Sequence, residues 1–271
     1  MKSTRTAIWF FAAWAWSSAA QSESQVNQDI RIWLPSVAAI AGGAEPLAAS
    51  IRPLPTPAPE HNDDKGSFDI SGTIAGVTDY RFRGVSLSNG GPVPQGGITA
   101  RYGPFSTSLW TSRIARTAGG SRQEVDLSLA ATKSIAGFEV TGSGLLYLYP
   151  GDGNSRYAEL ALNASRSFGK LNTSAGFSWA PAQSSIGDVD NYYVNLGSSW
   201  ENRLVTLSAT AGHEWGAFAP GGKWDWSVNA SRGVGPLTVS LSYLDSDARV
   251  LSRRGRNLAD STAVLGISLN Y

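Results

Sequence analysis

The chain has 271 residues, a formal net charge of +1 and 16% charged residues, against roughly 25% in a typical soluble domain. Without a basic excess, its charge gives no indication of a nucleic-acid partner. The absence of cysteine excludes a disulfide framework and a thiolate metal site. Its 30 glycines and its few charges together indicate that part of the surface faces something other than water.

The first 20 residues have the three parts of a secretory signal peptide. Lys2 and Arg5 precede an aromatic-rich apolar run at residues 7–16, and small residues follow at 17–20. A membrane-spanning helix would need about 20 apolar residues, and this run is shorter. We therefore expect residues 1–20 to be a signal peptide that exports the protein.

Residues 21–66 show no pattern of a folded domain. An apolar patch at 32–51 is interrupted by prolines, and it is compatible with a longer targeting segment or with a periplasmic arm. A spacer of the polyproline type follows at 53–59. We expect residues 21–66 to be a disordered periplasmic arm and linker, and the folded domain to span residues 67–271.

From residue 67 onward the chain offers alternating segments in place of helical periodicity. About 12 segments, each about ten residues long, alternate between apolar and polar side chains, and a tilted strand of that length crosses a bilayer. They lie at 67–80, 93–102, 105–113, 123–133, 138–149, 157–168, 171–180, 191–200, 204–213, 223–232, 237–245 and 260–271. Because open sheet edges are not tolerated in lipid, the prediction is a closed transmembrane antiparallel β-barrel of about 12 strands.

The polar side of these segments consists mainly of small hydroxyl residues. Thr206 and Ser208, for example, alternate with the apolar Val205 and Leu207. Such residues would line a lumen, while Tyr and Trp recur near segment ends, where interfacial girdles belong. The alternative, a soluble sandwich or a lipocalin-like barrel, would bury such aromatic residues in the middle of its strands.

The connections between the segments alternate in length, which predicts short periplasmic turns and longer external loops. The short connections lie at 103–104, 134–137, 169–170, 201–203 and 233–236. The long ones lie at 81–92, 114–122, 150–156, 181–190, 214–222 and 246–259. We expect the chain to enter the barrel from the periplasm and the last strand to end there.

The last segment ends in an aromatic residue. Leu269 and Tyr271 share the apolar side of this segment, which faces lipid in a transmembrane barrel. The ending resembles the C-terminal signal that bacterial outer-membrane barrels present to the barrel assembly machinery. We therefore predict an assembly role for Leu269 and Tyr271.

The most distinctive motif, Asp-Tyr-Arg-Phe-Arg-Gly at 79–84, lies within residues 71–86 and is followed by Pro-Gln-Gly-Gly-Ile at 94–98 and Ser-Leu-Trp-Thr-Ser at 108–112. Here the chain resembles the TorF-like porin family of Gram-negative outer-membrane proteins, of the Gcw_chp type. Thr78 stands where the family more often has Ser, and the long N-terminal arm is atypical. The resemblance implies a porin-like barrel of undefined substrate, and it supplies no catalytic residue and no ligand.

Strand parity makes a set of charged side chains candidates for lining the pore. On a first strand that reaches residue 83, Tyr80 and Phe82 would face outward, and Asp79, Arg81 and Arg83 would point into the external mouth of the lumen. The other candidates are Arg101, Glu124, Asp126, Glu159 and Asp225. Lining by Arg81 and Arg83 would bias the pore toward anions. In the alternative, the two arginines pair with carboxylates to anchor the first external loop, or they contact lipopolysaccharide phosphates.

The function predicted from these patterns is passive diffusion of small hydrophilic solutes or ions through an outer-membrane channel. One alternative is a barrel lipid or ester hydrolase, for which His213, Ser208 and Ser227 can be considered, although no nucleophile motif is present. Another is a plugged structural or adhesive barrel. Twelve strands fall between the roughly eight whose lumen side chains fill and the roughly sixteen that leave a wide channel, so the strand number does not decide whether the lumen is open.

The predicted partners are outer-membrane lipids and lipopolysaccharide, the assembly machinery, and small solutes or ions. No nucleic acid, no cofactor and no metal site is expected. The sequence leaves open whether the barrel forms a homo-oligomer.

Overall fold

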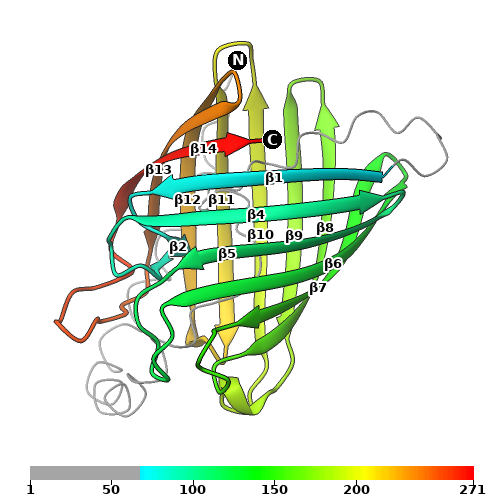
Figure 1. The fold of residues 1–271 in the computed structure, drawn as a ribbon. Coiled ribbons are helices and arrows are strands. Elements are labelled where there is room, and N and C mark those ends of the chain that lie inside the picture. The colour runs from blue at the N-terminus through cyan, green and yellow to red at the C-terminus, as the bar shows by residue number, and fades with distance from the viewer. Residues whose placement is uncertain (1–67) are drawn as a thin grey trace, which may run out of the picture.

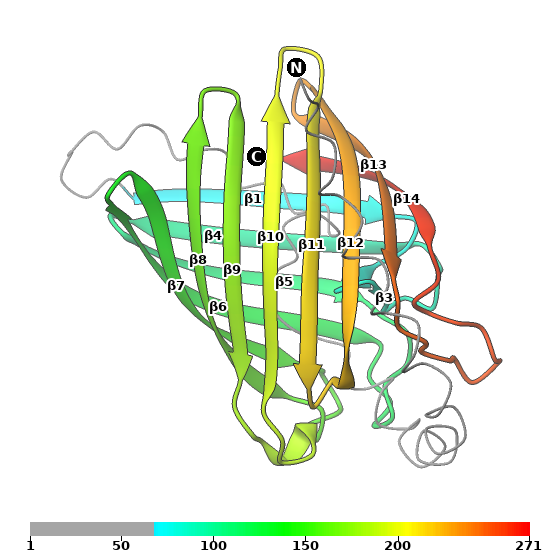
Figure 2. The same cartoon turned by 180° about the vertical axis from the view of Figure 1, so that it is seen from behind.

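The computed structural model describes residues 68–271, so the predicted signal peptide, arm and linker lie outside the described residues. Twelve long strands close into one antiparallel barrel, as Figures 1 and 2 show. They are β1 (Phe68–Val77), β4 (Val93–Tyr102), β5 (Phe105–Arg113), β6 (Gln123–Ile135), β7 (Phe138–Leu148), β8 (Tyr157–Phe168), β9 (Leu171–Ala180), β10 (Asn191–Glu201), β11 (Thr206–Gly216), β12 (Ala219–Val234), β13 (Leu237–Ser246) and β14 (Thr262–Asn270). The predicted all-β barrel is confirmed.

Alternation of side chains along each strand gives the barrel an apolar outer face. On β14, Leu265, Ile267 and Leu269 are exposed, while Val264 and Ser268, which point inward, are buried. Because so many large apolar side chains face outward, the outer face suits lipid better than water. None of the described residues belongs to a helix that is long and apolar enough to cross a membrane.

The connections define two ends of the barrel, which we call the turn end and the loop end. The turn end holds the short connections, such as Ala136 and Gly137, whose φ angles of 51° and 78° fit a two-residue hairpin turn. The loop end holds the segments 78–92, 114–122, 149–156, 181–190, 217–218 and 247–261. The expected alternation of short and long connections is therefore confirmed, with one exception.

The exception is the connection between β11 and β12, which was expected to be a loop over residues 214–222. Both strands continue past the predicted ends, and Glu214 pairs with Lys223 and Gly216 with Ala219. Two glycines within the segment accommodate a bulge in the ladder, with φ angles of 96° at Gly221 and 83° at Gly222. The connection itself shrinks to residues 217–218.

The barrel closes where β14 meets β1. This ladder runs from Thr73 paired with Asn270 to Val77 paired with Gly266. Beyond it, two backbone hydrogen bonds of 2.7 and 3.0 Å join Gly72 to Tyr271. A Cβ atom on Gly72 would lie 2.4 Å from the Tyr271 ring, so the terminal aromatic side chain covers the first strand at a position that has no side chain of its own.

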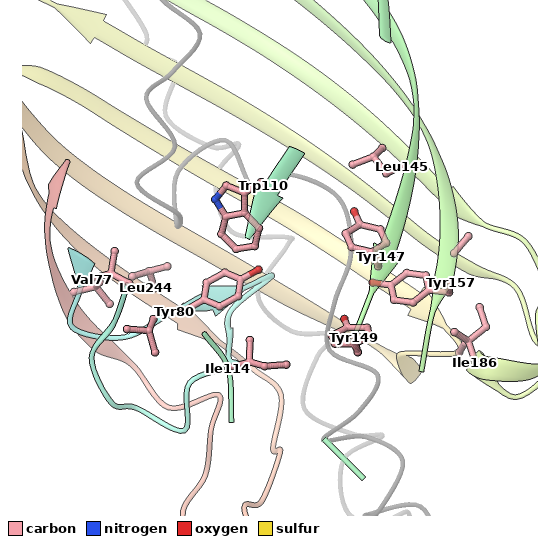
Figure 3. Packing of buried hydrophobic residues seen from close by; sticks show 14 residues of the cluster. Val77, Tyr80, Trp110, Ile114, Leu145, Tyr147, Tyr149, Tyr157, Ile186 and Leu244 are labelled. Atoms are coloured by element: carbon pink, nitrogen blue, oxygen red, sulfur yellow. The ribbon is translucent and has the colours of Figure 1, made fainter. Parts of the chain in front are cut away.

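The two ends of the lumen differ in what fills them. At the loop end a cluster of buried apolar side chains includes Trp110 on β5, Tyr147 on β7 and Tyr157 on β8 (Figure 3). The rings of Tyr147 and Tyr157 stack with their centroids 4.6 Å apart. The small hydroxyl residues predicted to line the lumen therefore share its loop end with buried apolar side chains.

Candidate functional site

The first long connection folds back into the barrel as a small hairpin. It contains β2 (Arg81–Phe82) and β3 (Val85–Ser86), which pair only with each other among the described strands. We call residues 79–88 the inner hairpin. All residues from 79 to 86 are buried, including Tyr80 and Phe82, which were expected to face outward. That expectation is wrong because β1 ends at Val77, and beyond it strand parity no longer applies.

Asp79 and Arg81 hold the inner hairpin together. Asp79 accepts hydrogen bonds from Ser86 Oγ at 2.6 Å, Ser88 Oγ at 2.8 Å and Arg81 Nε at 2.8 Å. Arg81 also donates to the backbone oxygens of Gly84, at 3.0 Å, and of Asp260 in the last loop, at 2.6 Å. Both predicted site residues therefore organise the hairpin and fasten it to a neighbouring loop.

Arg83, at the tip of the inner hairpin, reaches the far side of the barrel. Its guanidinium donates to Glu214 on β11 at 2.6 Å and to both carboxylate oxygens of Glu159 on β8 at 3.0 and 3.1 Å. It also lies over the ring of Tyr193, 4.1 Å from the centroid. Since β8 is seven strands from β1 in one direction and five in the other, Arg83 can reach it only through the lumen.

Lys223 completes this contact between the hairpin and the wall. Its Nζ donates to the Arg83 backbone oxygen at 2.5 Å, and it lies 2.9 Å from Glu214 and 3.6 Å from Asp225. Tyr193 donates to Asp225 at 3.1 Å. We define the buried charge network as six residues, of which two are cations and three are carboxylates. They are Arg83, Glu159, Tyr193, Glu214, Lys223 and Asp225.

The charge on Arg83 is held by its partners. Burial alone would lower the pKa of its guanidinium, but the carboxylates of Glu159 and Glu214 raise that pKa above its ordinary value. The arginine therefore remains a cation at every pH at which a protein is studied. With both guanidiniums paired, Arg81 to Asp79 and Arg83 to two glutamates, the structure gives no support to the expected anion preference.

Glu124 and Asp126 on β6 lie in the same closed end of the lumen. Both are buried, and Tyr149 donates to Glu124 at 3.1 Å. Burial first, and then the charges of Glu124 and Asp126, raise the pKa of Tyr80, which belongs to the inner hairpin. This places the two carboxylates beside the hairpin on a different wall from Glu159 and Glu214.

Arg101 is separated from the other candidates. It lies at the turn end of β4, with its Nη1 3.7 Å from Asp69 and 3.3 Å from Ser71 Oγ, and its side chain is 42% exposed. The structure therefore brings Arg83, Glu159 and Asp225 into one network, and it leaves Arg101 at the opposite end of the lumen.

Three members of the buried charge network were missed from the sequence: Tyr193, Glu214 and Lys223. Glu214 and Lys223 fell within or beside the segment read as a loop. Strand alternation could have identified Lys223. It lies two residues before Asp225, which the sequence places on the lumen side, and residues two apart on a strand face the same side.

The residues considered for a hydrolase are not assembled into a catalytic site. His213 stacks on the exposed Trp215, with ring centroids 5.6 Å apart, and its ring is tilted against Trp224 with centroids 4.5 Å apart. Ser227 is buried on the other face and hydrogen-bonds to Thr210 at 2.8 Å. Across residues 68–271, no group of three or more His, Asp or Glu side chains could hold a metal ion.

The closed antiparallel barrel is similar in fold to a solved porin. The NanC porin matches with a TM-score of 0.50 and 11% identity, covering 75% of this chain and 99% of that one. The KdgM porin, solved with disordered oligogalacturonate, matches with a TM-score of 0.49, 9% identity and the same coverage. A porin refined at 1.8 Å matches with a TM-score of 0.38 and 17% identity, covering 66% of this chain and 62% of that one.

The sequence assigns the chain to a family. Residues 61–271 match the model of a group described as bacterial proteins of unknown function, Gcw_chp, and the protein belongs to that family. No curated protein sequence matches the chain.

Proposed function

We propose that the protein is an outer-membrane channel of the TorF-like porin type, which passes small hydrophilic solutes or ions. The observation that carries the proposal is the contrast between the two faces of the wall. The outer face is apolar over the length of the strands, whereas the inner face at the turn end carries Ser, Thr and Asn. A closed barrel with these faces separates lipid from a polar interior.

Within this proposal the turn end faces the periplasm and the loop end faces the cell exterior, since outer-membrane barrels have short periplasmic turns. Leu269 and Tyr271 then form the signal for the assembly machinery, and the exposed loop end lies among lipopolysaccharide headgroups. Arg83, Glu159 and Asp225, together with Glu124 and Asp126, then border the pathway at the loop end. The number of chains in the native assembly is left open.

The inner hairpin favours a second candidate, a barrel whose lumen is permanently plugged and whose role is structural. A measurement of ion current through purified protein in planar lipid bilayers separates the two functions. The channel predicts discrete current steps from protein that migrates faster on gels before heating than after it. Fully folded protein that inserts into bilayers and carries no current would favour the plugged barrel. Recovery of the native protein in the soluble periplasmic fraction would contradict both.

A further inference from the structure

We propose that the inner hairpin is a movable gate at the loop end of the lumen and that Arg83 is the latch that keeps it closed. This inference rests on the proposed channel function, because the gate regulates the same pathway. It also explains how one barrel can have an obstructed lumen and still conduct.

The hairpin can leave its position without disturbing the barrel. β2 and β3 pair only with each other, so no ladder between neighbouring barrel strands depends on them. Their main-chain attachments beyond the hairpin go to loops: Ser86 donates to Leu258 O at 2.8 Å, and Ala115 donates to Leu87 O at 2.7 Å. Its hydrogen bonds with the far wall are made by Arg83 and by Lys223.

The polar contacts that hold the hairpin tip are of a kind that water can replace, whereas the ring of Tyr80 packs against Trp110 on β5 with centroids 5.3 Å apart. Removing ionised groups from water costs nearly as much as their mutual attraction returns, so a buried ion pair adds little net stability. When the hairpin moves out, Arg83, Glu159 and Glu214 recover their hydration, which offsets much of the attraction between them that is lost. The tip is also strained, because Arg83 adopts a φ of 45°, a left-handed conformation that a residue other than glycine seldom occupies.

The closed position requires a glycine next to the latch. A Cβ atom on Gly84 would lie 2.7 Å from Ser246 Cβ and 2.9 Å from Asp225 Cβ, closer than such atoms can approach. Gly84 also has a φ of 82°. The tip of the hairpin therefore touches the wall through bare backbone, and any side chain at this position would push the hairpin away from its seat.

Single-channel recordings in planar bilayers test the gate through two independent substitutions. Arg83→Met removes the charged latch and keeps most of the side-chain volume. Gly84→Ala keeps every charge, but its methyl group clashes with the barrel wall in the closed position. Both should increase the ratio of open to closed time by about tenfold or more, since each destabilises only the closed state. Gly91→Ala is the control, because a Cβ atom there meets only Ser88 O at an ordinary 3.5 Å.

A reversible cross-link provides the opposite perturbation. The chain has no cysteine, so Leu87→Cys with Ala115→Cys introduces one pair at residues joined by a backbone hydrogen bond. A disulfide spans roughly 4.4–6.8 Å between Cα atoms, a range suited to such neighbours. Oxidation should hold the channel in its low-conductance state, and reduction should restore the open events. Each single cysteine variant serves as the control for oxidation alone.

The outcomes separate the gate from the channel. If Arg83→Met, Gly84→Ala and the oxidised cross-link all fold and conduct as the wild type does, the channel stands and the gate is wrong. If every variant folds as a heat-modifiable barrel and none carries current, the channel function itself fails, and the gate fails with it.

Discussion

Two serines on one strand show how differently the two halves of the lumen are built. Ser174 and Ser178 lie on β9 and point to the same side of the wall, yet Ser178 is 5% exposed and Ser174 is only partly buried. Near Ser178 the interior holds the inner hairpin and stacked tyrosines, whereas near Ser174 the neighbouring strands contribute residues such as Ser165 and Gly197. The strands form a similar wall at both ends of the barrel. The inner hairpin, which belongs to one loop, fills the lumen at the loop end only.

The arginines of the two halves show the same contrast. Arg83, 1% exposed, donates to two carboxylates that are themselves buried. Arg101 is 42% exposed and lies 3.7 Å from an Asp69 carboxylate that is 64% exposed. Removing one partner of a buried pair leaves an uncompensated charge, whereas an exposed pair is screened by water. The same residue type should therefore have very different energetic effects at the two ends.

The largest effect is expected when the two arginines are neutralised in turn. Arg83→Met should weaken docking of the inner hairpin by about 3 kcal/mol, and Arg101→Met should change it by less than about 1 kcal/mol. Hydrogen exchange at the amides of Ser86 and Ala115, which donate to Leu258 O and Leu87 O across the docked contact, measures this docking. Equal exchange rates in the two variants would contradict the contrast between the ends.

The sequence could predict the wall because period-2 alternation is a local property. Strands β4, β5, β8 and β9 match their predicted ranges, since short turns such as Gly169 and Lys170 mark both neighbouring ends. The inner hairpin could not be found in this way. Alternation continues through Asp79, Arg81 and Arg83 as if the strand went on, and only the three-dimensional path shows that the chain turns inward after Val77.

The missed partners of Arg83 have a related cause. Glu214 lies within the segment 214–222 that the sequence predicts to be a loop, and Lys223 follows it directly, whereas the structure has a bulge inside a continuing ladder. Glu159 and Asp225 were placed on the lumen side by parity, but parity does not give their height in the barrel or the residue that they face. The pairing with Arg83 depends on contacts between residues 76 and 131 positions apart, which no local pattern encodes.

A smaller effect is expected at the turn end, which depends on the seam between β1 and β14 rather than on buried charge. Gly72→Ala should destabilise the barrel by about 1–2 kcal/mol, because its Cβ atom would overlap the Tyr271 ring. Gly76→Ala on the same strand is the matched control, since nothing lies within 4 Å of its Cβ position. Urea unfolding in lipid vesicles measures the difference. Equal stability of the two variants would mean that Tyr271 does not pack at the seam in the membrane.

The smallest effect concerns loops at the closed end. Asp152 accepts hydrogen bonds from Thr117 Oγ1 at 2.6 Å, Ser155 Oγ at 2.8 Å and the Gly119 amide at 3.0 Å. Burial alone would raise the pKa of Asp152, but these bonds outweigh it and hold the pKa below the ordinary 3.8. Because the folded pKa is the lower one, the carboxylate stabilises the loops at neutral pH and ceases to do so as the pH falls through the folded value.

The Gly119 amide shift, followed by NMR during acidification, measures this titration. Its midpoint should lie below 3.8, and the transition should be missing in Asp152→Asn. A midpoint above the ordinary value would show that the carboxylate does not accept these bonds in solution. The loops would then form a looser rim at the closed end than the structure shows.

The central claim, a lumen open at the turn end and closed by the inner hairpin at the loop end, is tested most directly by thiol labelling. In this cysteine-free chain, Ser174→Cys and Ser178→Cys place single thiols on the same strand and face. A charged, water-soluble maleimide should label position 174 readily and position 178 slowly, by about a hundredfold or more. Adding Arg83→Met should raise the labelling rate at position 178 to nearly that at position 174. Equal labelling of both positions in the otherwise wild-type chain would contradict the closed loop end.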